Sequence, residues 1–339
     1  MRHLPGLCLC FLISIALSSA AFAGGKDLQI YSIDVEGGQA TLFVSPSGES
    51  LLIDTGWAGY KGRDADRILQ VTRLAHLAKL DFVLITHYHR DHVGGVTQLA
   101  ERIPIGAFVD HGPNREDSDN TRKDFAAYVK LAGKRRMTVT PGEGLPLKGI
   151  TVRILTADGE QLDHPLPGAG TANFYCDSAR PAEPDPSENS RSLGVLITYG
   201  KFRVLDLGDL TKQKERNLVC PNNMIGTADL FIVTHHGTAS SNSKAAVWAF
   251  HPRVAIMNNG AKKGGNPPAW RIVHSSPGLE DLWQLHYAEE GGKDNNVAPA
   301  FIANVDDGSD GHYLKVTAHS DGSFTVFNSR TRRSKTYKK

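Results

Sequence analysis

The chain has 339 residues, of which 40% are hydrophobic and 22% are charged, and its formal net charge is +2. This composition is typical of a globular protein with one large domain or two small ones. Because six basic residues gather in the last ten positions, the rest of the chain is mildly acidic, so a general polyanion-binding surface is not evident, although the tail can touch a polyanion.

The first 23 residues are predicted to be a secretory signal peptide. Residues 1–3 carry positive charge, residues 7–17 form an apolar run, and residues 21–23 form a small-x-small cleavage site. The apolar run is too short to make a stable membrane span. We therefore expect a mature chain that starts near Gly24 and is periplasmic or secreted.

Hydrophobic patterns predict the elements of the first half. Strands are expected at 28–34, 40–44, 50–53, 82–86, 104–110 and 151–156. Amphipathic spacing predicts helices at 64–78 and 121–133. The stretch 157–191 has five prolines and no period, and is interpreted as a lid or insertion.

The second half is predicted in the same way. We expect strands at 193–198, 201–207, 229–234 and 253–257, a helix at 279–286, and a closing hairpin of 313–318 and 323–328. The basic tail 329–339 is interpreted as a frayed, solubilising end. Cys176 and Cys220 can pair in an oxidising compartment, but the sequence does not decide whether their geometry allows a bond.

Residues 86–95 hold four ligand-type side chains in the spacing H-x-H-x-D-H: His87, His89, Asp91 and His92. They follow a buried strand, and loops at strand ends are where scaffolds present chemistry. Without a cation such groups gain little from proximity and lose hydration. Imidazole and carboxylate together suit zinc and other first-row metals, so the pattern predicts a metal site.

Residues 81–87 and 229–235 share one plan, which is an Asp, four apolar residues, a Thr and a His. Each segment follows a strand–turn–strand unit that ends in an acid and a glycine. The repeat predicts two similar αβ halves packed face to face. It makes His235 the first choice as the distant metal ligand, and leaves His236 as a proton donor or as a partner of the ligands.

Three further positions have two interpretations each. Asp54, at a strand end, can hydrogen-bond a ligand histidine or serve as a turn residue. His111 can line the same cleft, but an ordinary loop histidine is the preferred interpretation. The pair Lys262 and Lys263 can meet an anionic group, but a solvated turn is preferred.

These motifs resemble the metallo-β-lactamase fold hydrolases. The resemblance runs from about residue 28 to about residue 260 and rests on residues 52–56, 87–92, 208–209 and His235. Within that superfamily, residues 33–39, 189–193 and 235–238 are similar to the soluble domain of DNA-internalisation competence proteins. The resemblance implies an α/β fold, an αββα sandwich of two similar halves, with a hydrolase domain at 24–328 and metals at one edge.

The resemblance also supplies a hypothesis for the site. The expected metal ligands are His87, His89, Asp91, His92, Asp209 and His235. Asp209 is expected to bridge two divalent ions, zinc or manganese, although one ion is also compatible with the motifs. Asp91 can also orient the attacking water. Many relatives place a ligand histidine before the strand at 193–198, where this chain has Asn189, a poor zinc ligand.

The expected activity is hydrolysis by a metal-bound hydroxide, since a divalent ion lowers the pKa of bound water from ~15.7 to about 7. A phosphodiester or nucleic-acid substrate is suggested by the similar competence proteins. The alternatives are hydrolysis of a small molecule such as a lactone or β-lactam, or a binding protein that keeps the fold without turnover. No partner protein is evident from the sequence.

Overall fold

The computed structural model describes residue 1 and residues 27–176, 185–306 and 311–339. Apart from residue 1, the predicted signal peptide lies outside the described residues, as do residues 177–184 of the predicted lid. Within the described ranges, no helix has both the length and the apolar character that crossing a membrane requires.

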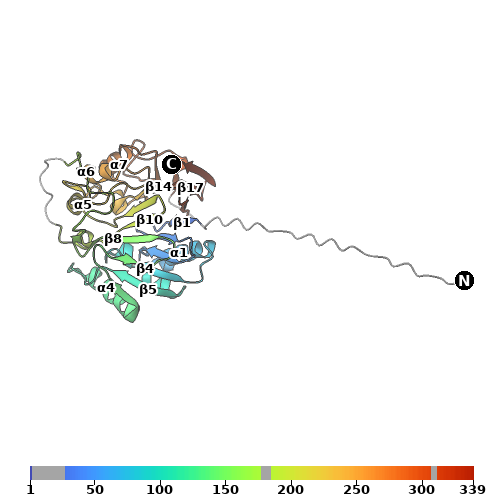
Figure 1. Ribbon diagram of the computed structural model, residues 1–339. Coiled ribbons are helices and arrows are strands. Elements are labelled where there is room, and N and C mark those ends of the chain that lie inside the picture. The colour runs from blue at the N-terminus through green and yellow to red at the C-terminus, as the bar shows by residue number, and fades with distance from the viewer. Residues whose placement is uncertain (2–26, 177–184, 307–310) are drawn as a thin grey trace.

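Two mixed sheets of nine described strands each form the centre of the molecule (Figure 1). The first sheet contains β1 (Leu28–Ser32), β2 (Thr41–Val44), β3 (Ser50–Ile53), β4 (Leu80–Leu84), β5 (Ile105–Asp110), β6 (Arg136–Thr138), β16 (Leu314–Ala318), β17 (Phe324–Asn328) and β18 (Arg333–Tyr337). Its strand order is β18-β17-β16-β1-β2-β3-β4-β5-β6.

The second sheet contains β7 (Gly144–Leu145), β8 (Thr151–Ala157), β9 (Glu160–Gln161), β10 (Gly194–Tyr199), β11 (Phe202–Asp206), β12 (Leu230–Ile232), β13 (Val254–Met257), β14 (Asp281–His286) and β15 (Ile302–Asn304). Its order is β15-β14-β13-β12-β11-β10-β8-β7, with β9 paired to β8.

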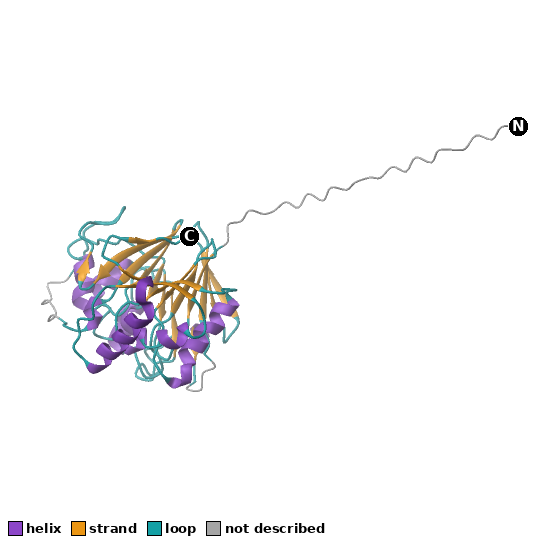
Figure 2. Cartoon of the chain, turned by 90° about the horizontal axis from the view of Figure 1, so that it is seen from below, coloured by secondary structure: helices purple, strands orange, loops and turns teal. Residues whose placement is uncertain are grey.

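Helices cover the outer faces of the two sheets (Figure 2). The first sheet carries α1 (Arg63–Leu74), α2 (Arg90–Val93), α3 (Val96–Ala100) and α4 (Asp119–Ala132), and the second carries α5 (Lys212–Val219), α6 (Lys244–Phe250) and α7 (Pro267–His274). The 3₁₀ turns are η1 (Tyr60–Gly62), η2 (Gly133–Arg135), η3 (Glu188–Arg191), η4 (Thr234–Gly237) and η5 (Pro299–Phe301). Side-chain caps start two of the helices, since Ser118 Oγ accepts from Thr121 N and Ser243 Oγ accepts from Ala246 N.

Three hydrophobic layers follow from the two-residue period of the strands. On β3, Leu51 and Ile53 point between the sheets, whereas Leu52 points to the helices of the first half. On β11, Val204 points between the sheets and Leu205 points to the helices of the second half. The predicted αββα sandwich is therefore confirmed.

The predicted repeat is also confirmed by the strand pairing. In the first half an antiparallel pair, β2 and β3, is followed by the parallel series β3, β4 and β5. In the second half the antiparallel pair β10 and β11 is followed by the parallel series β11, β12 and β13. Because parallel strands end at one edge of a sheet, the loops after β3, β4, β11 and β12 present their side chains at corresponding edges.

Two predictions about the C-terminal region are wrong. Residues 281–286 form strand β14 rather than a helix, because Leu282 points to the helices while Trp283 and Leu285 point between the sheets. The tail is not frayed over its whole length, since β18 pairs with β17. Tyr337 at its end is buried, and its hydroxyl donates to Asp281 Oδ2 at 2.6 Å.

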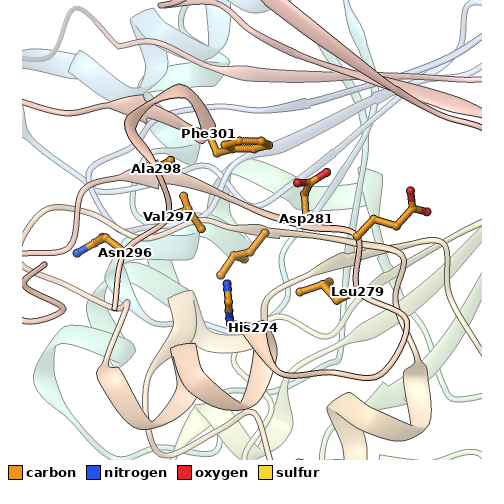
Figure 3. A pocket seen from close by; sticks show the side chains of 9 residues that line it. His274, Leu279, Asp281, Asn296, Val297, Ala298 and Phe301 are labelled. Atoms are coloured by element: carbon orange, nitrogen blue, oxygen red, sulfur yellow. The ribbon is translucent and has the colours of Figure 1, made fainter. Parts of the chain in front are cut away.

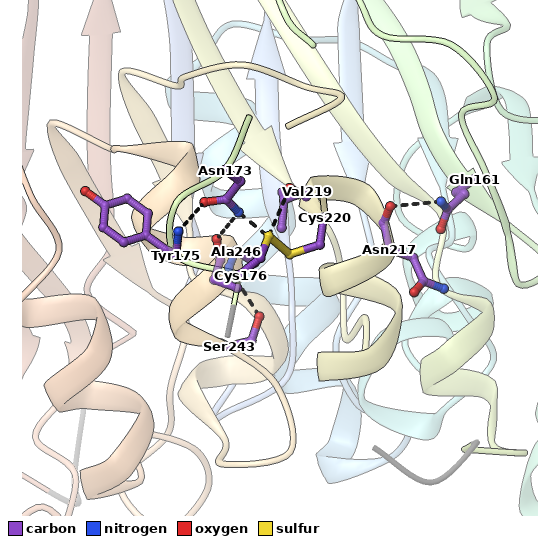
Figure 4. The surroundings of a disulfide bond; sticks show 10 residues. Gln161, Asn173, Tyr175, Cys176, Asn217, Val219, Cys220, Ser243 and Ala246 are labelled. Carbon is purple, nitrogen blue, oxygen red and sulfur yellow. Dashed lines mark hydrogen bonds between the residues drawn. A yellow bond between two sulfur atoms is a disulfide. The ribbon is translucent and has the colours of Figure 1, made fainter. Parts of the chain in front are cut away.

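The disulfide that the sequence left open is present between Cys176 and Cys220 (Figure 4). It attaches the described part of the predicted lid to the end of α5. Nearby, Leu166 N donates to Met224 O, Gly170 N donates to Asn223 O, and Asn173 Nδ2 donates to Ala245 O. This part of the segment therefore lies along the helices of the second half, and a lid role for 157–191 stays a prediction.

Candidate metal centre

Loops from both halves bring four ligand-type side chains together at the strand edge. Asp91 and His92 lie on α2, in the loop region after β4, whereas Asp209 follows β11 and His236 follows β12. One ligand atom of each residue lies within 4.8 Å of all the others, and all four residues are buried. The predicted convergence of the two halves at one site is thus present in the fold.

The distances within this group suit a shared cation. Asp91 Oδ2 lies 3.2 Å from His92 Nε2 and 3.2 Å from His236 Nε2. Asp209 Oδ2 lies 3.2 Å from His92 Nε2 and 3.4 Å from His236 Nε2. Two carboxylate oxygens and two imidazole nitrogens therefore point to one small volume.

A second group of donors contains His87, His89 and His235. His87 Nε2 is 3.0 Å from His89 Nδ1, so these rings direct a nitrogen atom each to the same place. Asp209 Oδ2 lies 3.9 Å from His87 Nε2 and 3.4 Å from His235 Nε2. One carboxylate oxygen is thus near both groups, which is the position that the sequence hypothesis gives to Asp209.

A carboxylate fixes the orientation of His92. Asp54 Oδ2 lies 2.7 Å from His92 Nδ1, and this histidine directs its other nitrogen, Nε2, to the donor group. Asp54 is itself held by Thr86, whose N donates to Oδ1 at 2.8 Å and whose Oγ1 donates to Oδ2 at 2.7 Å. Carboxylate–histidine pairs of this kind fix the tautomer of a metal-binding imidazole. Of the two interpretations of Asp54, the contacts favour the partner of a histidine at the candidate centre.

Similar contacts orient the other rings. Glu116 Oε2 lies 2.9 Å from His89 Nε2, and it also accepts from Glu188 N at 3.0 Å. His236 Nδ1 donates to Asn258 O at 3.2 Å, and so its Nε2 is left for the donor group. The sequence did not single out Glu116 or Glu188, because both reach the centre from loops with no repeating pattern.

The pKa values follow from burial and from this crowding of charges. Burial raises the pKa of Asp209, but the charges of His235, His236 and His92 lower it well below its usual range. Burial lowers the pKa of His92, but the carboxylates of Asp209, Asp91 and Asp54 raise it well above its usual value. Burial also lowers the pKa of His235 to about 4. The carboxylates around His92 therefore favour a positive charge at this place, from a proton or from a metal ion.

The donor set passes a direct test for a divalent ion. Asp209 Oδ1 is buried and accepts no hydrogen bond within the part of the chain that the structure describes. A buried carboxylate oxygen without a partner is costly, whereas a cation would satisfy it. Since the converging atoms are imidazole nitrogens and carboxylate oxygens, the residues present fit a first-row divalent metal.

His235 and His236 are placed differently relative to the four-residue group. His236 is buried within the four-residue group, whereas the His235 side chain is 14% exposed and its Nδ1 lies 3.1 Å from Ser241 Oγ. Both histidines have a positive φ of 55°. His236 thus joins Asp91 and His92, whereas the Nε2 atom of His235 lies 3.4 Å from Asp209 Oδ2.

Two other residues of the sequence hypotheses, His111 and Asn189, lie outside the donor groups. His111 belongs to a buried contact outside the donor groups, with its Nε2 3.0 Å from Glu188 Oε2, which agrees with an ordinary structural histidine. Asn189 Oδ1 is buried without a hydrogen-bond partner among the described residues. Three residues after Asn189, the hydroxyl of Ser192 does reach the centre, where it accepts from Asp209 N at 3.2 Å.

Lys263 is a site residue that the sequence analysis underestimated. Its Nζ donates to Asp91 Oδ2 and lies 4.8 Å from the centroid of the Trp57 ring. The adjacent Lys262 meets the expectation of a solvated turn, since its side chain is 73% exposed and its Nζ lies 3.6 Å from Glu289 Oε1. The preferred interpretation was therefore right for Lys262 and wrong for Lys263.

A cavity of about 410 Å³ lies elsewhere, beside α7 and β14 (Figure 3). It is lined by His274, Leu279, Glu280, Asp281, Leu282, Asn296, Val297, Ala298 and Phe301. Residues of the two donor groups do not line it, so its size says nothing about the candidate metal centre.

Comparison with known proteins gives one matching family model and several distant relatives. A model of the metallo-beta-lactamase superfamily matches residues 33–180. Recombination protein 2 of Haemophilus influenzae is 24% identical over 272 residues, which are 80% of this chain and 28% of that protein. Hydroxyacylglutathione hydrolase of Idiomarina loihiensis is 33% identical over 85 residues, which are 25% of this chain and 27% of that protein.

The matched region is therefore little more than a quarter of the length of these two relatives. Among solved structures, the metallo-beta-lactamase fold protein YhfI from Bacillus subtilis is 14% identical, with a TM-score of 0.47, and the match covers 76% of this chain and 96% of that one. The αββα sandwich of two mixed sheets is the metallo-β-lactamase fold, and the part of the chain that the superfamily model matches lies within it.

Proposed function

We propose that the chain is a metal-dependent hydrolase that holds two divalent ions at the junction of its halves. His87, His89, His235 and Asp209 are assigned to one ion, and Asp91, His92, His236 and Asp209 to the other. The carrying observation is the convergence of buried ligand atoms within 4.8 Å around Asp209, whose Oδ1 accepts no hydrogen bond from the described residues. Such ions supply a nucleophile at neutral pH and stabilise negative charge on the reacting group.

The remaining residues position these ligands. Asp54 fixes His92, Glu116 fixes His89, and the main-chain oxygen of Asn258 fixes His236. Asp91 is assigned a second task, since an ionised carboxylate at the centre can accept a hydrogen bond from the attacking water and orient it. Because both ring nitrogens of His236 are engaged, we assign it to the ligands rather than to proton donation.

We further propose that the substrate is a phosphodiester, as in nucleic acid. The support is the match to Recombination protein 2, which spans 80% of this chain, whereas the match to hydroxyacylglutathione hydrolase of Idiomarina loihiensis spans 25%. We place the protein in the periplasm or outside the cell. The signal-peptide pattern of the first 23 residues and the Cys176–Cys220 disulfide support an oxidising compartment.

Metal analysis of four purified proteins tests the assignment of the donors: the unchanged chain, His236→Asn, His235→Asn and His319→Asn. We expect each of the first two variants to lose about one metal equivalent, because each removes one ligand from a different ion. His319→Asn is the matched control, since this histidine pairs with Asp27 outside the donor groups and should keep full metal content. A chain that binds no transition metal would contradict the proposal.

Four substrates then test the reaction: bis(p-nitrophenyl) phosphate, single-stranded DNA, nitrocefin and a simple lactone. We expect the two phosphodiesters to be cleaved. Asp209→Asn should abolish this cleavage, because it weakens the binding of both ions. Cleavage of nitrocefin or the lactone alone would replace the phosphodiester proposal. Metal binding with no turnover of any of the four would favour a binding protein.

A further inference from the structure

One lysine reaches the metal centre from outside the donor groups. The Lys263 side chain is 33% exposed, whereas that of Asp91, to which its ammonium donates, is 9% exposed. The ammonium also lies above the face of the Trp57 ring, at 4.8 Å from its centroid. Lys263 therefore stands at the boundary between the buried ligands and solvent, where a substrate must approach.

Glycines hold this lysine close to the centre. A Cβ atom on Gly37 would lie 2.9 Å from Gly260 N and 3.0 Å from Lys263 Cβ, so the two loops touch main chain to main chain. A Cβ atom on Gly38 would lie 2.4 Å from Asp91 O. Gly260 N donates to Lys263 O at 2.9 Å, which closes the lysine loop. The Gly37-Gly38 segment thus fixes the Lys263 backbone and the Asp91 backbone relative to each other.

The charge pairing of Lys263 differs from that of nearby cations. Arg115 pairs with Asp158 and Arg90 pairs with Asp124, which are carboxylates outside the donor groups. Lys263 pairs with Asp91, which the proposed function assigns to a metal ion. A dication on the same carboxylate weakens this ion pair, because like charges repel each other, and so leaves the ammonium for an anionic partner.

From these contacts we propose that Lys263, over the Trp57 ring, forms a cationic subsite that binds the charged group of the substrate beside the metal centre. This inference rests on the proposed function and deepens it, since the anion would be a non-bridging oxygen of the phosphodiester. A lysine suits this task as a compact point charge on a flexible stem. The face of Trp57 stabilises the ammonium without neutralising it.

The test compares Lys263→Gln and Lys263→Arg with Lys262→Gln as the matched control. We expect Lys263→Gln to raise the KM for bis(p-nitrophenyl) phosphate about tenfold, a typical loss for one charge-assisted contact. The KM of Lys263→Gln for the neutral ester p-nitrophenyl acetate should change less than about twofold. The KM of Lys263→Arg for bis(p-nitrophenyl) phosphate should lie close to that of the unchanged chain. The KM of Lys262→Gln should equal that of the unchanged chain.

Metal content separates this role from a structural one. Lys263→Gln should bind manganese or zinc at least as tightly as the unchanged chain, because it removes a cation from Asp91. Loss of metal, or an equal loss of activity on the charged and the neutral ester, would show that the lysine only supports Asp91 and would overturn the inference.

A binding experiment tests the subsite independently of the hydrolase proposal. If the unchanged chain cleaves no phosphodiester, the proposed function fails. Calorimetric titration of the manganese-loaded protein with inorganic phosphate then tests whether Lys263 binds an anion. Phosphate affinity about tenfold weaker in Lys263→Gln would support the subsite. Equal affinity in both proteins would overturn it.

Discussion

Replacement of Asp54 by Asn should weaken metal binding without changing any proposed ligand. The carboxylate of Asp54 accepts from Thr86 N through Oδ1, and from Thr86 Oγ1 and the His92 ring through Oδ2. An amide has one oxygen only, so either Thr86 N–H or His92 Nδ1–H must face an NH₂ group. In either rotamer a buried donor loses its acceptor, and the charge that fixes His92 is lost.

The expected loss is about 10-fold to 100-fold in metal affinity, as is typical for partners of metal-binding histidines. This corresponds to about 1.4 to 2.8 kcal/mol. Competition with a chromophoric chelator measures it. Asp81→Asn is the matched control, because Asp81 Oδ2 likewise accepts from a main-chain N and a hydroxyl, both of Ser50, and no histidine of the described ranges pairs with Asp81. Unchanged affinity in Asp54→Asn, or an equal loss in Asp81→Asn, would refute the reasoning.

Two other predictions concern stability. Burial raises the pKa of Glu215 from 4.5 to about 7, so its contribution to stability is fully present below pH 4.5 and is lost as the pH rises through about 7, a change of about 3 kcal/mol. Glu215→Gln should remove that part of the pH dependence in urea unfolding between pH 4.5 and 8, and parallel curves would contradict the assignment. The Cys176–Cys220 bond joins residues 44 apart, so the double serine variant should lose about 4 kcal/mol of unfolding free energy in the chain-entropy model. A Tm equal to that of the disulfide-bonded protein would contradict this second prediction.

Local patterns predicted the sandwich and the first half of the centre. The loop with His87, His89 and His92 can be predicted from the sequence because all three histidines lie within six residues, in one loop after one buried strand. The repeat predicted the second half because the strand-end plan recurs. Strand β14 was mistaken for a helix because a strand buried on both faces has no alternation that separates it from a short apolar helix.

The contacts that the sequence did not predict are those that cross between loops. Lys263 reaches Asp91 because glycines bring two loops into contact, and Glu116 reaches His89 across 27 positions. A periodic sequence pattern does not predict a contact between two loops. The sequence also shows no sign of the left-handed turn at His235 and His236, each with a φ of 55°, or of the place of His236 in the four-residue group.

The two halves therefore share one strand arrangement, but the acids near their strand ends have different roles. Asp54 after β3 and Asp206 at the end of β11 each come two residues before a glycine, Gly56 and Gly208. Asp54 orients His92, whereas Asp206 accepts two hydrogen bonds from Gln39 Nε2 of the other half, at 3.0 and 2.8 Å. Burial raises the pKa of Asp206 to about 6. The first of these acids fixes a ligand and the second joins the halves, so the spacing of the two donor groups depends on a contact that no ligand makes.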